Sequence, residues 1–199
     1  MKNSLLIISF FALGVLIGRF IFLPKTIIQT DISLYALYIL LLLVGIGVGS
    51  DAKTRQALKN LNIRILSVPL SVIIGTFIGA SLFSIFIPGL RLKESLAIAA
   101  GFGYYSLSSI LIAQISGNVL GTIALLSNLS REIITLLFAP LMVKYFGKIA
   151  PIASGGATSM DTTLPIITKF SGKEYAIIAV FNGLVLTLLV PFLITLILK

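Results

Sequence analysis

Two long stretches of this sequence carry no charged side chain, and they restrict the fold more than any other feature. Residues 34–48 and 184–198 contain only uncharged residues, most of them apolar. Apolar runs of about 20 residues cross a bilayer as α-helices, whereas the strands of membrane β-barrels alternate in hydrophobicity over about 10 residues. The sequence therefore predicts an all-α integral membrane protein.

The composition agrees with this class and excludes several kinds of function. Hydrophobic residues make up 58% of the chain and charged residues 11%, against about 25% charged residues in soluble domains. The net charge of +9 comes from basic residues near the ends of apolar segments, where they anchor and orient helices rather than bind nucleic acid. With no Cys and no His, the chain lacks thiol and imidazole chemistry and the usual zinc and haem ligands. We expect no metal and no cofactor.

Seven hydrophobic segments with short connections form a single transmembrane domain. They are residues 4–23, 32–50, 65–87, 95–115, 120–146, 150–168 and 174–198. We interpret the first as a retained helix, because it is long for a signal peptide and contains Arg19. The connection 51–64 carries four basic residues against one acid, which places it in the cytoplasm. If all seven segments cross, the N-terminus is cytoplasmic and the C-terminus lies outside.

The segment 95–115 contains the polar stretch "GFGYYSLSS", residues 101–109. Two interpretations are open. The serines could form a polar helix face that packs against neighbouring helices, or the stretch could line a polar cavity in the membrane. In the second case, Tyr104 and Tyr105 would stack on a substrate or form hydrogen bonds with it.

The segment 120–146 carries two adjacent charges near its middle, in "SNLSRE". Asn128, Arg131, Glu132 and Thr135 share one helical face, and the first three are candidate substrate-binding residues. An ionisable side chain at the bilayer centre costs about 2.5–3.5 kcal/mol on insertion scales, so this face points toward protein or water. Arg131 is then either an internal strut, bound to an acid or to the carbonyls of a broken helix, or a direct contact of the substrate.

The segment 150–168 contains "GGATSMDTTLP" and is predicted to be a broken helix. Gly155 and Gly156 disfavour a continuous helix, and Pro165 pushes the residue before it away from helical angles. Unwinding is expected between about residues 154 and 165. Unwound backbone at this depth is tolerated only inside protein or beside water, and secondary transporters bind substrates and coupling ions at such breaks.

Asp161 is the acid of this broken segment. Only Asp161 and Glu132, of six acids, lie within hydrophobic segments. If the chain binds a cation or a proton, these two carboxylates are the candidates, with Asp161 first. A structural alternative remains, because Thr158-x-x-Asp161 matches a capping box, in which an acid satisfies amides at the start of a helix.

The stretches "GFGYYSLSS", "SNLSRE" and "GGATSMDTTLP", in this order and at these separations, resemble the bacterial L-lysine exporter family of the LysO type. The resemblance extends from roughly residue 30 to the C-terminus. It implies an inner-membrane secondary transporter that moves lysine and lysine analogues out of the cytoplasm, in exchange for protons. It also implies that Asp161 is needed for transport.

The family also suggests that part of the transporter lies outside this chain. Its members are about half as long again, with about three further helices and a second intramembrane acid at the N-terminal side, as two inverted five-segment repeats would require. Here residues 65–199 hold five segments, the second repeat, and residues 1–50 hold two, the end of the first. We therefore expect the larger piece of a split exporter, completed by a small membrane partner or by a second copy in a homodimer.

The expected mechanism is alternating access around the broken helix. Asp161, with an acid from the partner, would bind the ammonium groups of lysine, and a proton would compete for the same carboxylate. The α-amino-acid end would bind Thr158, Ser159, Thr162 and freed backbone groups at Gly155 and Gly156. Arg131 is an alternative partner for the α-carboxylate, because a guanidinium matches its geometry.

Functions other than lysine export differ in how well they fit the sequence. A carrier for another amino acid or an organic cation, or a non-transporting accessory subunit, fits the same composition. An intramembrane aspartyl protease does not, because "GVGSD", residues 47–51, departs from GxGD and its acid begins a cytoplasmic connection. The chain is therefore not expected to be an enzyme.

Overall fold

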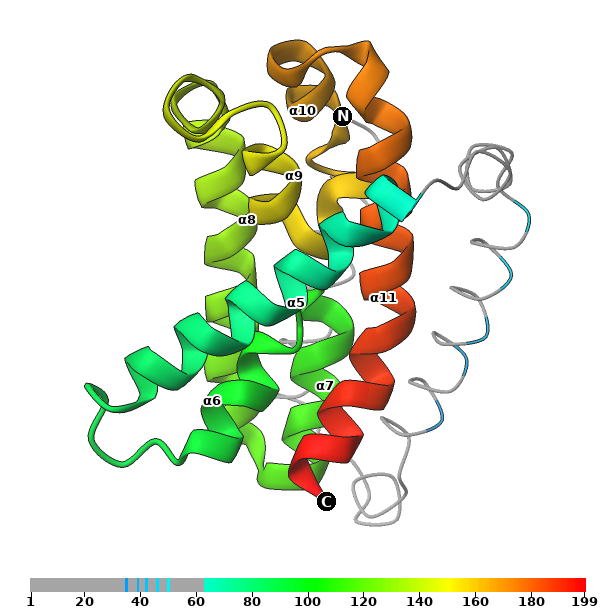
Figure 1. Ribbon diagram of the computed structural model, residues 1–199. Helices are drawn as coiled ribbons and strands as arrows, with labels where there is room; N and C mark the ends of the chain where they lie inside the picture. The colour runs from blue at the N-terminus through cyan, green and yellow to red at the C-terminus, as the bar shows by residue number, and fades with distance from the viewer. Residues whose placement is uncertain (1–34, 36–38, 40–41, 43–45, 47–49, 51–62) are drawn as a thin grey trace, which may run out of the picture. The chain divides into compact units, whose positions relative to one another are not determined.

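The computed structural model describes residues 63–199, together with residues 35, 39, 42, 46 and 50. The predictions for the segments 4–23 and 32–50 and for the connection 51–64 lie outside the described residues, apart from those isolated positions and the first residues of α5. Between residues 63 and 199 all regular structure is helical (Figure 1). This confirms the all-α fold class.

Three of the described helices are long and apolar enough to cross a membrane. They are α5 (Ile63–Ser84), α8 (Asn118–Phe146) and α11 (Ala176–Leu198). The start of α5 lies beside the start of α11, where Val68 packs with Ala179. The end of α5 lies beside the start of α8, since both line one cavity. The chain is therefore a multi-pass membrane protein.

The segment 95–115 does not cross as one helix, which corrects the sequence-based expectation. It forms two short helices, α6 (Leu92–Ala99) and α7 (Tyr105–Ser116). The backbone between them turns sharply, with positive φ angles of 46° at Phe102 and 93° at Gly103. We call residues 92–116 the first hairpin and residues 100–104 its tip.

Both ends of the first hairpin lie on the same side of the membrane. Near its beginning, Ser95 Oγ donates a hydrogen bond of 2.9 Å to the carbonyl of Ala80, close to the end of α5. Its other end is joined to α8 by Gly117 alone. Because the end of α5 and the start of α8 lie together, the first hairpin enters the membrane and returns (Figure 1).

The segment 150–168 is broken, as predicted. Helix α9 (Ala150–Gly155) is followed by the 3₁₀ helix η1 (Gly156–Met160) and then by α10 (Leu164–Ser171). Prolines stand in the first turns of α9 and α10, where a missing N–H removes no helical hydrogen bond. We call residues 150–171 the second hairpin and residues 155–163 its tip.

The second hairpin also returns to the side from which it enters. Lys148, just before α9, lies 3.6 Å from Glu174, just after α10 and within the 3₁₀ helix η2 (Lys173–Tyr175). The Lys148 ammonium also lies 5.5 Å from the ring centre of Tyr175. The segment therefore re-enters and does not cross.

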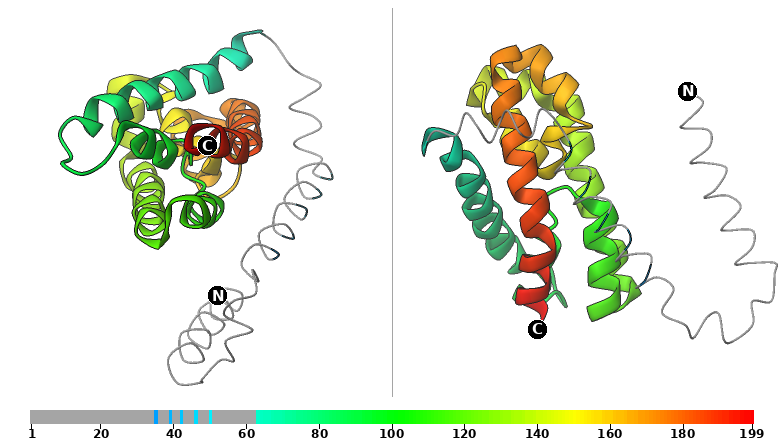
Figure 2. Two further views of the ribbon diagram at one scale, coloured as in Figure 1. Left: turned by 90° about the horizontal axis from the view of Figure 1, so that it is seen from below. Right: turned by 90° about the vertical axis from the view of Figure 1, so that its right-hand side faces the viewer.

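The two hairpins enter from opposite sides, and their tips meet between the spanning helices (Figures 1 and 2). The backbone N–H of Ala157 in the second tip donates a hydrogen bond of 2.8 Å to the carbonyl of Phe102 in the first. Both residues are buried, with 2% and 0% exposed surface. The crossing of two unwound segments thus forms the centre of the described structure.

Candidate functional site at the hairpin tips

Asp161 lies at the end of η1 and is exposed on the surface of the described residues. Its Oδ1 accepts hydrogen bonds from Thr162, at 2.6 Å from the backbone nitrogen and 3.4 Å from Oγ1. No basic side chain of the described residues forms an ion pair with it. The carboxylate is therefore available to a cation.

The depth of Asp161 makes this exposure informative. The preceding residue, Met160, lies against Gly183, so close that a Cβ at Gly183 would overlap it. Gly183 is the eighth residue of α11, about 10 Å along the helix from its start. A carboxylate within a span does not face hydrocarbon. The face around Asp161 must therefore be covered by protein or by water.

The capping-box explanation of Asp161 is wrong. The Oγ1 of Thr158 donates to the carbonyl of Gly155 at 2.9 Å instead of capping a helix. Helix α10 begins three residues after Asp161, with Thr163 as its N-cap and no side-chain cap. Asp161 therefore does not act through the predicted capping box, and its side chain bonds only the adjacent Thr162 among the described residues.

The other polar residues of the second tip divide into an inner and an outer set. Thr158 and Ser159 are buried, at 7% and 0% exposed. The hydroxyl of Ser159 lies 2.7 Å from the carbonyls of both Gly156 and Ala179. Thr162 is exposed beside Asp161. Of the three hydroxyl residues predicted to contact substrate, only Thr162 has its polar group on the open face.

Tyr104 and Tyr105 bring the first tip to the same place. Both are partly exposed and stand where the tip ends and α7 begins. Tyr104 interacts electrostatically with Asp161, and Tyr105 with both Asp161 and Glu132. The structure therefore gathers two phenols and two carboxyls from three elements that are separate in the sequence.

Glu132 lies at the middle of α8 and is 8% exposed. Its Oε2 is buried and has no hydrogen-bond partner among the described residues. A buried polar atom without a partner is costly, so Glu132 is a second candidate group at this site, beside Asp161. It does not pair with its neighbour Arg131.

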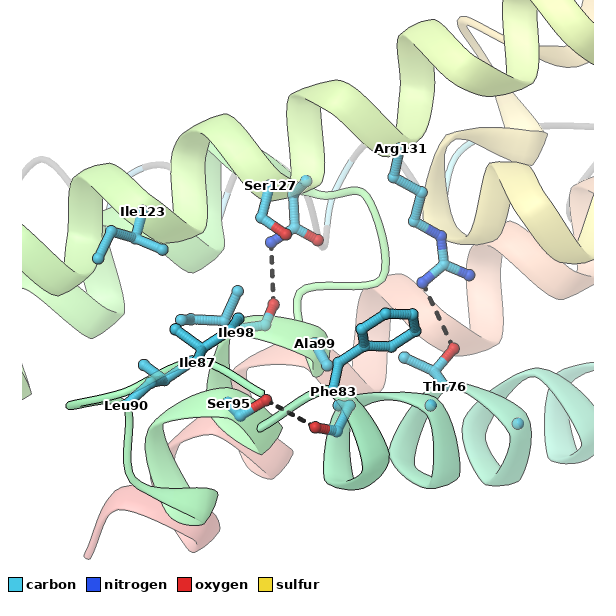
Figure 3. Close-up of a pocket in the computed structure, with 14 residues that line it drawn as sticks. Thr76, Phe83, Ile87, Leu90, Ser95, Ile98, Ala99, Ile123, Ser127 and Arg131 are labelled. Atoms are coloured by element: carbon cyan, nitrogen blue, oxygen red, sulfur yellow. Dashed lines mark hydrogen bonds between the residues drawn. The ribbon is translucent and has the colours of Figure 1, made fainter. Parts of the chain in front are cut away.

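Arg131 binds backbone carbonyls of the second hairpin and also reaches Thr76 on α5, the contact drawn in Figure 3. Its Nε and Nη2 donate to the carbonyls of Ser154 and Ala153, at 2.8 and 2.9 Å, and its Nη1 lies 3.4 Å from Thr76 Oγ1. These carbonyls belong to the last turns of α9, which the break leaves without helical partners. This is the geometry of the internal strut.

Asn128 and Asn182 hold the two tips. The amide of Asn128 accepts from the Gly103 N–H at 2.7 Å and donates to the Ile98 carbonyl at 2.9 Å. Asn182 on α11 donates to the Gly156 carbonyl at 3.0 Å. Sequence reasoning placed Asn128 among the substrate contacts and missed Asn182 altogether. The available signal for Asn182 was a single amide in an otherwise apolar final segment.

A cavity of about 400 Å³ lies behind the tips, between α5, α6 and α8 (Figure 3). Its walls are mostly apolar, and Arg131, Thr76 and Asn128 supply polar groups. Arg131 thus lies between this cavity and the carbonyls of α9. The cavity and the Asp161 face are two distinct regions next to the same pair of tips.

Comparison with known proteins yields two matches of wide coverage and one match to a family. The family described as "Lysine exporter LysO" matches residues 8–198. The lysine exporter LysO of Escherichia coli is 38% identical over 165 residues, 83% of this chain and 54% of that protein. The "Putative lysine exporter" of Haemophilus influenzae is 37% identical over 164 residues, 81% of each chain. The chain spans about half the length of the E. coli relative. No solved structure matches.

Proposed function

The chain belongs to the lysine exporter LysO family, and we propose that it forms the substrate-binding part of a secondary transporter that exports lysine across the inner membrane. The observation that carries this proposal is the carboxylate of Asp161, which has no ion-pair partner among the described residues and lies at the tip of a re-entrant hairpin within the membrane. Re-entrant and broken helices at this depth are sites of substrate and ion binding in transporters.

The chemistry of this face suits a cationic amino acid. Asp161 supplies the charge for an ammonium group, and Thr162 lies beside it with an exposed hydroxyl. Tyr104 and Tyr105 add phenolic oxygens and aromatic faces, which attract ammonium groups. The methylene chain of lysine would lie along the tyrosine rings. The inner hydroxyls of Thr158 and Ser159 fix the shape of the tip from behind.

Proton exchange would use the two intramembrane carboxyls in different ways. Asp161 is exposed to an aqueous or protein-lined space and would bind lysine and a proton in alternation. Glu132 is buried, its Oε2 has no hydrogen-bond partner among the described residues, and it lies near Tyr105. It would hold the proton while Asp161 holds the substrate. Arg131 is committed to two carbonyls, so in this mechanism it positions the second hairpin and does not bind the α-carboxylate.

We propose that further helices cover the Asp161 face, since a carboxylate there faces protein or water and not lipid. In the E. coli relative, about half of the protein lies outside the matched region. We propose that a small membrane partner supplies about three helices and a second acid, as an inverted pair of repeats would require. A homodimer is the alternative arrangement.

The fold also suggests an orientation. The side where α5 begins carries Arg64, Lys144, Lys148, Lys169 and Lys173, and the opposite side carries Arg91, Lys93 and Lys199. Each side has one acid nearby, Glu174 and Glu94. The positive-inside rule therefore assigns the start of α5 and both ends of the second hairpin to the cytoplasm. The C-terminus then lies outside.

The test is lysine efflux from cells that lack their own exporter and are loaded with a lysine dipeptide. Wild type is compared with Asp161→Asn and with Glu174→Gln, a matched control that removes an exposed carboxylate outside the site. The chain is expressed alone and together with a small membrane protein encoded beside it. We expect efflux only when the two proteins are expressed together. Glu174→Gln should retain this efflux, and Asp161→Asn should reduce it at least tenfold. A tenfold reduction corresponds to a loss of about 1.4 kcal/mol of binding free energy.

Other outcomes would contradict specific parts of the proposal. Full efflux with Asp161→Asn would remove Asp161 from the binding site. Efflux by the chain alone would remove the need for a partner and favour a homodimer. Absence of lysine efflux in every combination, with both proteins present in the membrane, would leave a carrier for another cation or an accessory subunit.

A further inference from the structure

The two hairpins are held by the same contact, made twice. In the first, Asn128 Nδ2 on α8 donates to the carbonyl of Ile98 at 2.9 Å, across 30 residues of sequence. In the second, Asn182 Nδ2 on α11 lies 3.4 Å from the carbonyl of Ile152, again across 30 residues. In both cases the acceptor lies in the short helix that leads into a tip, and the donor lies on the spanning helix that follows the hairpin.

Each asparagine also reaches its tip directly. Asn128 Oδ1 accepts from the Gly103 N–H at 2.7 Å, across 25 residues. Asn182 Nδ2 donates to the Gly156 carbonyl at 3.0 Å, across 26 residues. The two amides are buried, at 3% and 0% exposed. A buried amide that is engaged at one point in the short helix and at a second point in the tip fixes the tip relative to the spanning helix.

The sequence around these contacts repeats with the same spacing. Ile98-Ala99 and Gly101 in the first hairpin correspond to Ile152-Ala153 and Gly155 in the second. The first hairpin and α8 form one unit, and the second hairpin and α11 form another that enters from the opposite membrane face. The two units thus have asparagine, isoleucine and glycine at equivalent positions, and they have opposite orientations in the membrane. This arrangement is typical of transporters.

The charged groups do not repeat. Arg131 and Glu132 correspond in the second unit to Val185 and Leu186, and Asp161 corresponds in the first unit to Leu107. What the two units have in common is therefore the means of holding a tip. What distinguishes them is the chemistry presented there.

The geometry points to Asn128 and Asn182 as an equivalent pair of positioning residues, each of which holds the tip of its own hairpin and so sets the spacing of the groups around Asp161. Neither amide faces the open side of the site, because their donors and the Asn128 acceptor are engaged inside the protein. The effect of these two asparagines on transport rests on the proposed function, whereas their effect on the positions of the tips does not.

A thiol-labelling experiment tests the pairing directly, because the chain contains no native cysteine. One cysteine is placed in each tip region at a buried position: Ser108→Cys, whose hydroxyl has no hydrogen-bond partner among the described residues, or Ala157→Cys. Each is combined with Asn128→Ala, Asn182→Ala or the control Asn118→Ala, an exposed residue at the start of α8. The rate of labelling by a membrane-permeant maleimide is measured in native membranes.

Each asparagine variant is expected to raise the labelling rate only at the cysteine in its own hairpin. Asn128→Ala should raise the labelling rate at residue 108 about tenfold or more with little effect at residue 157, and Asn182→Ala should do the reverse, as expected for the loss of hydrogen bonds to buried backbone groups. Asn118→Ala should change neither rate. Equal increases at both cysteines in both variants would show general loosening and overturn the inference, as would unchanged rates.

Lysine efflux gives the second readout. Asn128→Ala and Asn182→Ala should each reduce efflux at least tenfold at unchanged amounts of protein in the membrane, while Asn118→Ala should not. Wild-type efflux in either asparagine variant would overturn the positioning role. If the wild-type protein exports no lysine either alone or together with its small membrane partner, the proposed function fails, and the labelling pattern still decides whether the asparagines hold the tips.

Discussion

The carbonyl of Phe102 accepts a hydrogen bond of 2.8 Å from the backbone N–H of Ala157 and thereby joins the tips of two hairpins that enter from opposite faces of the membrane. The neighbouring residue, Gly156, has no room for a side chain, because a Cβ there would overlap the same carbonyl oxygen. The substrate site proposed around Asp161 depends on this close approach of two unwound backbones.

We predict that Gly156→Ala destabilises the protein and abolishes transport. The added methyl would collide with a backbone atom that cannot move without breaking the tip, and φ is +62° at this position. Backbone strain of this kind costs about 1–3 kcal/mol. The measurement is the Tm of the purified protein in detergent, together with lysine efflux.

Gly147→Ala is the matched control for Gly156→Ala. Gly147 also has a positive φ, of +88°, but no atom of the described residues lies within 4 Å of its Cβ position. Gly147→Ala therefore has the conformational cost of a positive φ but not the collision with a backbone atom. Equal losses of Tm in the two variants would show that contact with Phe102 does not contribute.

Re-entry of the second hairpin predicts which positions are labelled from which side. Single cysteines replacing Lys148 and Lys173, at its two ends and both exposed, should react with a membrane-impermeant maleimide from the same face. Cysteines replacing Arg91 and Ser116, at the ends of the first hairpin, should react from the opposite face. Labelling of intact cells is compared with labelling of inverted vesicles. If positions 148 and 173 react from different faces, the segment crosses and the re-entrant fold is wrong.

The sequence was sufficient to predict one of the two breaks. In the second hairpin, Gly155, Gly156 and Pro165 all disfavour a continuous helix. The uncharged stretches on either side of them are too short to form a spanning helix. In the first hairpin, "GFGYY" lies inside a segment long enough to span the membrane, and it fits a polar face of a continuous helix as well as it fits a break. The break depends on a positive φ at Phe102, which no residue preference indicates because the strain is imposed by the tip packing.

The charged residues of the candidate site could be predicted from the sequence, but which polar residues of the tip are exposed and which are buried could not. Asp161 and Glu132 stood out because acids are rare inside spans. Sequence alone could not show that Thr158 and Ser159 turn inward while Thr162 remains exposed, since that depends on the 3₁₀ geometry of η1. Asn182 escaped notice because its partner, the Gly156 carbonyl, exists as an acceptor only once the helix is broken.

Arg131→Lys separates the strut from a substrate contact. Lysine keeps the charge but cannot donate to two adjacent carbonyls from a planar fork. We expect a loss of about 1–3 kcal/mol in stability, as for hydrogen bonds of charged groups to buried acceptors, measured by thermal unfolding. Arg91→Lys, at an exposed ion pair with Glu94, is the control. Unchanged stability combined with a raised KM for lysine would return Arg131 to the substrate site.

Glu132→Gln tests whether the two intramembrane carboxyls have separate roles. Glutamine matches the protonated acid in shape, so the fold should keep its stability, but it cannot release a proton. In vesicles, Glu132→Gln should retain exchange of lysine for lysine and lose the acceleration of lysine transport by a pH gradient. Asp161→Asn should lose both, because the substrate itself no longer binds. Glu94→Gln, outside the hydrophobic segments, should lose neither. If Glu132→Gln responds to the pH gradient as wild type does, the proton is carried by Asp161 alone, and competition between proton and lysine at that one carboxylate is the coupling step.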